Sequence, residues 1–490
     1  MKKIFKIKVV LVLALIFSFL SCTKDWEEMN TNPNEPTVVP ATNVLVYSLR
    51  YYCDNFVDEW MNMNNISTYA GHITKIQYID ESRYLERESV INDAWRDMYT
   101  TLLQLNKAKI LAADEGNTVL VGAAMTFQAF MLHRATDLWK NIPWSNAMQG
   151  EDEVSSPTYD TQESIYFAIL EQLRQANELL ATGEGEMGEG DILFYGDVVK
   201  WQKFCNSLRL RLAIRMSFVL PVEAQSIVEE ILGDPGQFPI MESNDDNAFF
   251  YWPGLLPYME PWAEDQISEN RDDHGMCETL VDTLLAFNDP RLPVYAHRST
   301  SDSVYRGLDA GAVDGSFALS DISRIGARFR DTEAGFSPLM RYSELLFIIA
   351  EAAKNGWSTG ISAQAAYEAG VIASLEENEV ASGDITTYLA DPKVTWNDSY
   401  TQIYIQKWIC LFKQGHEAWA ETRRTDVPLM PAATDALYSG HNRPPFRFKY
   451  PTRESNLNGA NLTQNLGGII DHFWGNDNGK MWWDTRTGVN

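Results

Sequence analysis

A dense group of charged residues follows Gly415 and contains residue types that catalyse hydrolysis in many enzymes. His416 and Glu417 match the start of the zinc-binding pattern HExxH, in which two histidines one helical turn apart hold the metal. Residue 420 is alanine, so the second zinc ligand is missing. The other members of the group are Glu421, Arg423 and Arg424. Glu421 and Arg424 have the spacing that forms ion pairs on one helix face. The group is therefore either a functional site or a structural brace, and charged helix faces are more often structural.

Other catalytic chemistry finds little support in the sequence. The chain has no P-loop, and its seven histidines show no metal-ligand spacing. Two carboxylates are enough to hydrolyse a glycosidic bond, but 67 acidic residues offer many pairs and no spacing singles one out. A surface glycoside hydrolase therefore stays open as an alternative. We expect a non-catalytic protein without a cofactor. The acidic loops leave calcium binding open, although the sequence contains no EF-hand loop.

The charged group lies in a predicted helical hairpin over residues 404–425. Ile405, Trp408, Ile409 and Phe412 recur at the three-to-four residue spacing of one helix face, and Trp419 continues the pattern. We expect both tryptophans to be deeply packed. Gly415 fits the left-handed position that ends a helix, so a second helix follows at His416 without a long loop.

Paired helix patterns recur along the chain and predict an all-α fold. The pairs are residues 89–113 with 118–139, 161–180 with 197–218, and 338–354 with 361–379, preceded by a single apolar helix at 41–63. Ser337 and Pro338 suit the cap and first position of the helix at 338. Pairs that recur every 35 to 45 residues or so suggest tetratricopeptide-like repeats. Residues 233–337 read instead as loops with one helix at 277–287, and such a long irregular segment usually carries function.

The N-terminus has the pattern of an exported lipoprotein. Four lysines precede an apolar run at 9–20, which is too short for a final membrane span and typical of a signal peptide. Leu20, Ser21 and Cys22 then resemble a bacterial lipobox, in which the cysteine is lipidated; a plain secretory cleavage site is the alternative. We predict a signal peptide at 1–21, a lipid-attached tether at 22–40 and one globule at 41–490. The globule divides into an N-terminal helical part (41–232), a loop-rich, ligand-facing part (233–337) and a C-terminal helical part with a tail (338–490).

The net charge limits the kinds of molecule that the protein can bind. The formal net charge is −27, so the surface repels nucleic acid and anionic lipid headgroups, and membrane attachment must come from lipid chains.

The cysteines that remain after Cys22 are Cys53, Cys205, Cys277 and Cys410. They are widely spaced and mostly lie in apolar helix patterns, so we interpret them as small core residues. Export makes disulfides possible, but the sequence selects no pairing.

Six stretches together resemble the SusD-like (RagB/SusD) family of outer-membrane lipoproteins. They are TDLWKNIPWSNAMQG at 136–150, PTYDTQESIY at 157–166, GDILFYGDVVKWQKFCNSLRLRLAIR at 190–215, NDPRLPVY at 288–295, RYSELLFIIAEAA at 341–353 and QKWICLFKQGHEAWAETRRTDVP at 406–428. Residues 243–271 match nothing in the family pattern. The acidic residues just after Cys22 also resemble the surface-export signal of Bacteroidetes lipoproteins.

The resemblance implies both a fold and a role. The fold is an arc of tetratricopeptide-like helix pairs that scaffolds a loop-rich second part. The role is to capture nutrients as a lid over a SusC-like TonB-dependent outer-membrane transporter; such pairs import oligosaccharides, and some members handle peptides. Because the charged hairpin lies inside a family signature shared by members with different ligands, it is interpreted as a brace.

Candidate ligand-binding residues follow from what a glycan offers, which is apolar C–H faces ringed by hydroxyl groups. Exposed aromatic rings in irregular segments suit such faces. Trp252, Tyr258 and Trp262 are the first choice, because flanking prolines stiffen their loop; an aromatic cluster that merely closes the loop is the alternative. The second choices are Tyr69, Tyr78 and Arg83. We therefore predict a surface-exposed glycan-binding lipoprotein, with a peptide-binding importer subunit as the alternative within the family.

Overall fold

The protein is described from a computed structural model. The structure describes residues 39–148, 155–188, 190–467, 473–474 and 479–490. Cys22, the predicted signal peptide and most of the predicted tether lie outside these residues. Residues Ala41–Asn490 form one compact unit in which helices predominate. The prediction of an all-α fold is confirmed.

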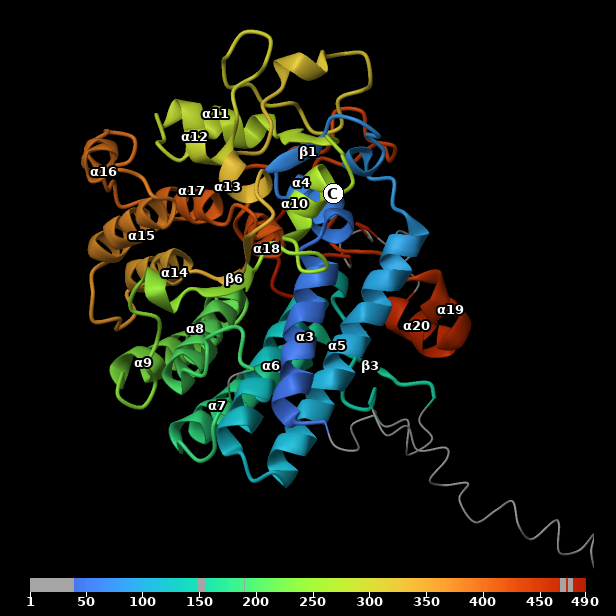
Figure 1. Ribbon diagram of the computed structural model, residues 1–490, viewed down its shortest axis with the longest axis vertical. Coiled ribbons are helices and arrows are strands. Elements are labelled where there is room, and N and C mark those ends of the chain that lie inside the picture. The colour runs from blue at the N-terminus through green and yellow to red at the C-terminus, as the bar shows by residue number, and fades with distance from the viewer. Residues whose placement is uncertain (1–38, 149–154, 189, 468–472, 475–478) are drawn as a thin grey trace, which may run out of the picture. The chain divides into compact units, whose positions relative to one another are not determined.

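The N-terminal half of this unit is a series of helices that pack one on the next (Figure 1). Helix α3 packs on α5, α5 on α6, α6 on α7, α7 on α8 and α8 on α9. Their bounds are α3 Ala41–Phe56, α5 Glu88–Asp114, α6 Thr118–Trp139, α7 Gln162–Ala181, α8 Val198–Met216 and α9 Pro221–Gly233. The predicted helices at 89–113, 118–139, 161–180 and 197–218 are therefore confirmed to within two residues at each end.

Local sequence explains where these helices begin and how closely they pack. Asn117, Thr161 and Asp197 cap α6, α7 and α8, each side chain accepting a hydrogen bond from a backbone N–H in the first turn. Gly122 of α6 faces α7. A Cβ atom added at Gly122 would lie 2.8 Å from Leu180 Cγ of α7. Only glycine allows the two helices to approach this closely.

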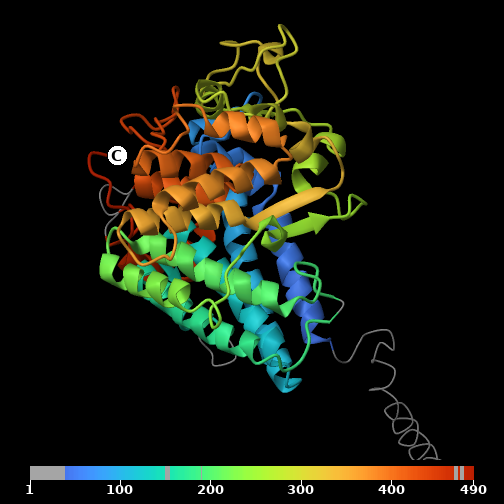
Figure 2. The same ribbon diagram turned by 90° about the vertical axis from the view of Figure 1, so that its left-hand side faces the viewer.

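The C-terminal half continues the series. Helix α14 packs on α8, α15 and α17, and Figure 2 shows these helices lying in rows above the N-terminal ones. The bounds are α14 Tyr342–Lys354, α15 Ala363–Glu377, α16 Ser382–Leu389, α17 Tyr400–Cys410, α18 Gly415–Thr425, α19 Thr452–Leu457 and α20 Gly459–Leu466. The expected start of a helix at Pro338 is wrong, because Ser337 and Pro338 lie in strand β6 (Gly335–Met340) and α14 begins only at Tyr342.

The segment 233–337 is irregular but carries more structure than expected. Besides α11 (Glu278–Ala286), which confirms the helix predicted at 277–287, it contains α10 (Pro261–Ile267), α12 (Leu292–Tyr295) and α13 (Ala327–Arg330). Two antiparallel ribbons bind it to the rest: β1 (Ile73–Lys75) pairs with β5 (His274–Met276), and β4 (Ala248–Trp252) pairs with β6. A third ribbon joins β2 (Ile142–Pro143) to β3 (Tyr159–Asp160). These pairings are non-local, which is why local patterns did not reveal them.

Residues 411–414 form the corner between α17 and α18. Trp408 and Trp419 are at most 1% exposed, as predicted. The left-handed residue is not Gly415 but Lys413 (φ 68°), and Gly415 is the first residue of α18. A Cβ at Gly415 would lie 2.4 Å from Ser67 Oγ, in the short helix α4 (Ser67–Tyr69). The glycine is therefore required for close approach and not for its backbone conformation.

The charged group on α18 is a buried ionic network. Glu417 pairs with Arg134 of α6 at 2.8 Å, with Arg211 of α8 at 3.6 Å and with Arg215 of α8. All four side chains are at most 2% exposed. The carboxylate thus ties α18 to two helices of the N-terminal half, which confirms the interpretation as a brace.

The second half of the network joins α18 to α14 and α17. Arg424 pairs with Glu351 at 2.6 Å and with Glu421 at 2.9 Å, and Lys407 pairs with Glu421 at 3.2 Å. Burial raises the pKa of Glu421, but Arg424, Lys407 and Arg215 outweigh it and lower the pKa to about 2. Every charge in this part of the network therefore has a partner at neutral pH.

Four cysteines of the described chain, Cys53, Cys205, Cys277 and Cys410, are buried and free, as expected of core residues. Among the residues that the structure describes, no helix has both the length and the apolar character needed to cross a bilayer.

Candidate functional site

The two tryptophans of the proline-framed loop are in the core. Trp252 ends strand β4, is 3% exposed and donates a hydrogen bond from Nε1 to Ser337 Oγ at 2.9 Å. Trp262 lies in α10 and is fully buried beneath Lys413, whose Nζ is 5.1 Å from the ring centroid. The expectation that these rings are displayed for stacking is therefore corrected: β4 pairing and the α10 cap turn them inward.

Two of the second-choice residues also have structural partners. Tyr69 is 2% exposed and packs edge-on against Trp419 at 5.3 Å. Arg83 is tied to Asp435, with Nε donating to the backbone oxygen and Nη2 to the carboxylate, both at 2.7 Å. Tyr69 offers no free face, and Arg83 joins the turn η2 (Glu81–Arg83) to the C-terminal part of the chain.

Tyr78 remains a candidate because its ring is displayed. It lies in the turn after β1, which ends at Lys75, and is 64% exposed. Its φ of 50° is in the left-handed region that non-glycine residues rarely adopt. The neighbouring Gln77 fixes the turn, since its Nε2 donates to the backbone oxygen of Asp272 at 2.9 Å. The guanidinium of Arg271 lies over the ring, 5.6 Å from its centroid.

A groove of about 330 Å³ opens beside Tyr78. Its lining residues are Ile76, Gln77, Tyr78, Asp314, Gly315, Phe317 and Leu319. The loop that forms the far wall rests on a small hydrophobic cluster of Ile76, Leu308 and Ile322, separate from the main core. Residues 76–78, just after β1, therefore form one side of the groove, and the loop on its other side is held by few apolar contacts, which is typical of binding surfaces.

Tyr258 is the other exposed candidate. It is 43% exposed, and the guanidinium of Arg50 lies 4.6 Å from its ring centroid. The turn that carries it also exposes Leu255 and Leu256 by 70% and 66%. Tyr258 does not line the groove beside Tyr78.

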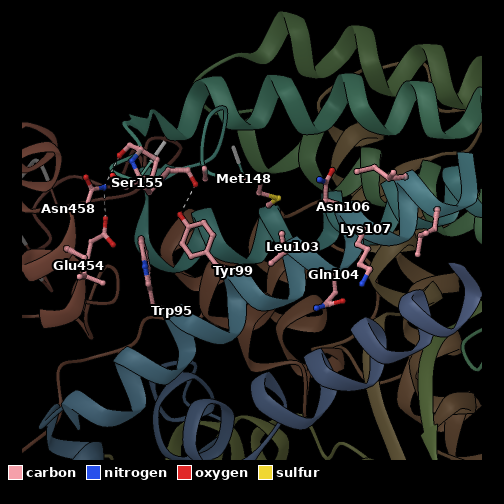
Figure 3. Close-up of a pocket in the computed structure, with 16 residues that line it drawn as sticks. Trp95, Tyr99, Leu103, Gln104, Asn106, Lys107, Met148, Ser155, Glu454 and Asn458 are labelled. Carbon is pink, nitrogen blue, oxygen red and sulfur yellow. Dashed lines mark hydrogen bonds between the residues drawn. The ribbon is translucent and has the colours of Figure 1, made fainter. Parts of the chain in front are cut away.

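A larger groove than the one beside Tyr78 lies between α5, the β2–β3 segment and α19 (Figure 3). It has a volume of about 1110 Å³. Its aromatic residues are poorly placed for stacking, because Trp95 is 5% exposed and Tyr99 is held by a hydrogen bond from its hydroxyl to Pro143 O at 2.7 Å. The exposed surface is contributed by aliphatic residues such as Leu103 and Leu457. Tyr78 therefore displays a more accessible aromatic ring than this groove does.

The structure gives no support to a catalytic site among the described residues. Burial lowers the pKa of His416 to about 3, and its Nε2 lies 3.2 Å from Phe56 O, to which it donates. The segment GWSTG at 356–360 matches GxSxG, but it follows helix α14 instead of a strand, and Ser358 N donates to Glu229 Oε1. The segment GEGEMG at 183–188 matches a dinucleotide fingerprint but follows α7, so it too lacks the required strand.

Sequence reasoning missed Arg271, Gln77 and Phe317. Arg271 ends the stretch 243–271, in which we recognised no family motif, and its approach to Tyr78 depends on the pairing of β1 with β5. Phe317 lies in a loop without periodicity. No local sequence signal places either residue near residue 78.

Comparison with known proteins relates the chain to one family. Residues 33–451 match the SusD-like family described as starch-binding and associating with the outer membrane. No curated protein matches the sequence.

Three solved structures share the fold. A chitin-binding SusD homologue from Flavobacterium johnsoniae is 24% identical, the match covering 91% of this chain and 98% of that one with a TM-score of 0.76. A SusD-like protein from Bacteroides thetaiotaomicron is 23% identical, with 92% and 100% covered and a TM-score of 0.79. A SusD homologue from Bacteroides vulgatus is 23% identical, with 92% and 98% covered and a TM-score of 0.78. At these identities the likeness establishes the fold.

Proposed function

The chain belongs to the SusD-like family, and on that premise we propose that it captures a glycan at the cell surface and delivers it to a SusC-like TonB-dependent transporter. The family is one of binding proteins, so the chain is not an enzyme, and the alternative of a surface glycoside hydrolase is set aside. Lipid attachment at Cys22 accords with a family that associates with the outer membrane.

We assign glycan capture to the surface around Tyr78. The observation that carries this assignment is a tyrosine ring 64% exposed, at positive φ, beside a groove and under a guanidinium. A sugar ring presents C–H groups that stack on such a ring, while its hydroxyls need donors and acceptors at the rim. Arg271 and Gln77 supply donors, and Asp314 supplies an acceptor. The groove is short, so it suits one or two sugar rings of a longer chain.

A strained backbone at Tyr78 supports a binding role. A tyrosine in the left-handed region costs roughly 1 kcal/mol, and such conformations persist where the surroundings hold them in place. Here the hydrogen bond from Gln77 to Asp272 and the pairing of β1 with β5 hold the turn. The ring is thereby fixed before ligand arrives, which reduces the entropy lost on binding.

The test is a binding titration of the purified full-length protein against soluble starch and chitin oligosaccharides. Tyr78→Ala should weaken binding of whichever glycan binds by about tenfold, because a stacking contact contributes up to about 1.5 kcal/mol and a loss of about 1.4 kcal/mol raises Kd tenfold. Tyr78→Phe keeps the ring and should bind within about twofold of wild type.

Tyr195→Ala is the matched control. Tyr195 is 73% exposed and also has positive φ (54°), but it lies between α7 and α8. It should retain wild-type affinity. Unchanged binding by Tyr78→Ala would reject the Tyr78 surface as the site, whereas binding of peptides and of no glycan would favour the peptide-importing alternative.

A further inference from the structure

Trp60 displays its ring outside the groove beside Tyr78. It is the second residue of the π-helix η1 (Glu59–Ile66) and is 39% exposed. Among the tryptophans that the structure describes, it is the most exposed. The Asp58 carboxylate caps the helix by accepting a hydrogen bond from Met61 N at 2.8 Å, which fixes the turn that carries the ring. π-Helical turns are uncommon and often lie at functional sites.

A pocket of about 310 Å³ lies beside Trp60, between the end of α3, the start of η1 and the first turns of α5. Several of its polar atoms are available to a ligand. Trp60 Nε1 and Ser89 Oγ form no hydrogen bond within the described part of the chain. The Arg87 guanidinium lies 5.6 Å from the ring centroid of Trp60 and binds Glu81 through Nε alone. Its two terminal amino groups can therefore donate hydrogen bonds into the pocket.

The charges around the pocket balance one another. Asp93 and Asp97 both pair with Arg96, at 2.6 Å and 2.8 Å. Arg87 pairs with Glu81. An anionic ligand would meet the two aspartates, and a cationic ligand would meet the two guanidinium groups. A neutral ligand with many hydroxyl groups avoids both penalties and can use the ring and the donors together, so the pocket suits a sugar.

The buried Lys75 of β1 joins this pocket to the neighbouring surface. Its Nζ lies 3.8 Å from Glu81 Oε2 and 3.8 Å from Asp273 Oδ2, and all three side chains are at most 4% exposed. On one side, Glu81 binds Arg87, the arginine that lies over Trp60. On the other side, Asp273 binds a second arginine.

The second arginine, Arg271, lies between the two exposed rings. Its guanidinium pairs with Asp273 and lies over Tyr78, while its Nε is 3.5 Å from Glu59 Oε1. Glu59 directly precedes Trp60. Because the Arg271 side chain is 31% exposed, the protein surface continues from Tyr78 across Arg271 to the Trp60 pocket.

We propose that the Trp60 pocket binds further sugar rings of the same glycan chain that Tyr78 binds. This inference rests on the function proposed above, in which the groove beside Tyr78 accommodates one or two rings of a longer chain. The Trp60 pocket has a similar size and suits one or two more. Two weak contacts with one chain strengthen each other, because the first holds the chain at a high effective concentration near the second. The protein should therefore prefer long glycan chains to short ones.

The experiment compares the affinity of the full-length protein for long starch and chitin oligosaccharides with its affinity for disaccharides of the same sugars. The wild type should bind the long form of its glycan at least about tenfold more tightly. Trp60→Ala should lose most of this preference, and Trp60→Phe, which keeps an aromatic ring, should retain most of it. Phe167→Ala removes a ring on α7 that is 43% exposed, and this control should keep the full preference.

Tryptophan fluorescence gives a second measurement, on the wild-type protein itself. Acrylamide is the suitable quencher, because the net negative charge of the protein repels iodide. The part of the quenching that Trp60→Phe removes belongs to Trp60. Saturation with the long oligosaccharide should abolish most of that part in the wild type, because the glycan covers the ring.

Two results would overturn the Trp60 pocket as a site. One is a full preference for long chains in a Trp60→Ala protein with the wild-type melting temperature. The other is saturation of the wild type without protection of Trp60 from acrylamide, which decides the matter even where Trp60→Ala does not fold. Failure of the Tyr78 assignment is distinguishable, because Tyr78→Ala would then bind like wild type while Trp60→Ala would not. A wild type that binds no glycan would reject both.

Discussion

In two regions of the molecule an arginine lies over an aromatic ring, once in the core and once at the surface. In the brace on α18, the Arg423 guanidinium lies 3.7 Å from the ring centroid of Trp419, and both residues are at most 2% exposed. At the surface, Arg271 lies 5.6 Å from the ring of Tyr78, which is 64% exposed. The contact is chemically the same, so burial decides whether the ring is structural or free to receive a ligand.

The two regions also differ in how their charges are paired. In the brace, each charge around Glu417 and Arg424 lies in a dry interior against an opposite charge, and removing one leaves the other unsolvated. Around Tyr78, water reaches the side chains and screens them. A substitution in the brace should therefore change stability, and one at the surface should change binding.

The largest expected effect comes from Arg424→Ala. It leaves Glu351 without its cationic partner and Glu421 with fewer, both in the interior. The free energy of unfolding should fall by about 3 to 5 kcal/mol, measured by chemical denaturation. Arg174→Ala, which removes a solvent-exposed pair on α7, should leave the denaturation midpoint unchanged. An Arg424→Ala protein of full stability that no longer binds ligand would mean that the brace is a site.

Trp262→Ala tests the boundary between the two regions, because the sequence places this residue in the loop and the structure places it in the core. Its ring packs against Phe412 at 6.1 Å and beneath Lys413. Loss of the ring should lower the free energy of unfolding by about 3 kcal/mol. The protein that remains folded should bind glycan with wild-type affinity in the same titration. Selective loss of binding at unchanged stability would return Trp262 to the ligand site.

The brace could be predicted from sequence because its information is local. Helical spacing placed Trp408 and Trp419 on one face, and the three-residue interval between Glu421 and Arg424 indicated an ion pair. The sequence did not predict the ion-pair partners of this group. Arg134, Arg211 and Glu351 belong to other helices, and helical periodicity carries no information about contacts between helices.

The surface was harder to predict because exposure is a tertiary property. The prolines around Trp252 and Trp262 predicted a stiff loop, but the pairing of β4 with β6 turns Trp252 inward and the first turn of α10 turns Trp262 inward. Tyr78 has no motif of its own. Its exposure follows from the β1–β5 ribbon, whose two strands lie far apart in the sequence.

Tyr78→Gly should have the smallest effect on stability. It also distinguishes most clearly between a structural and a binding role. Glycine adopts a φ of 50° without the steric cost that tyrosine bears there, although it also gives the unfolded chain more freedom. The two effects oppose each other, so the free energy of unfolding should change by less than about 1 kcal/mol, measured by chemical denaturation. Glycan affinity should nevertheless fall by about tenfold, because the stacking face is gone. If Tyr78→Gly loses binding and keeps its stability, the strained conformation of Tyr78 serves ligand binding. A large loss of stability would instead show that Tyr78 has a structural role.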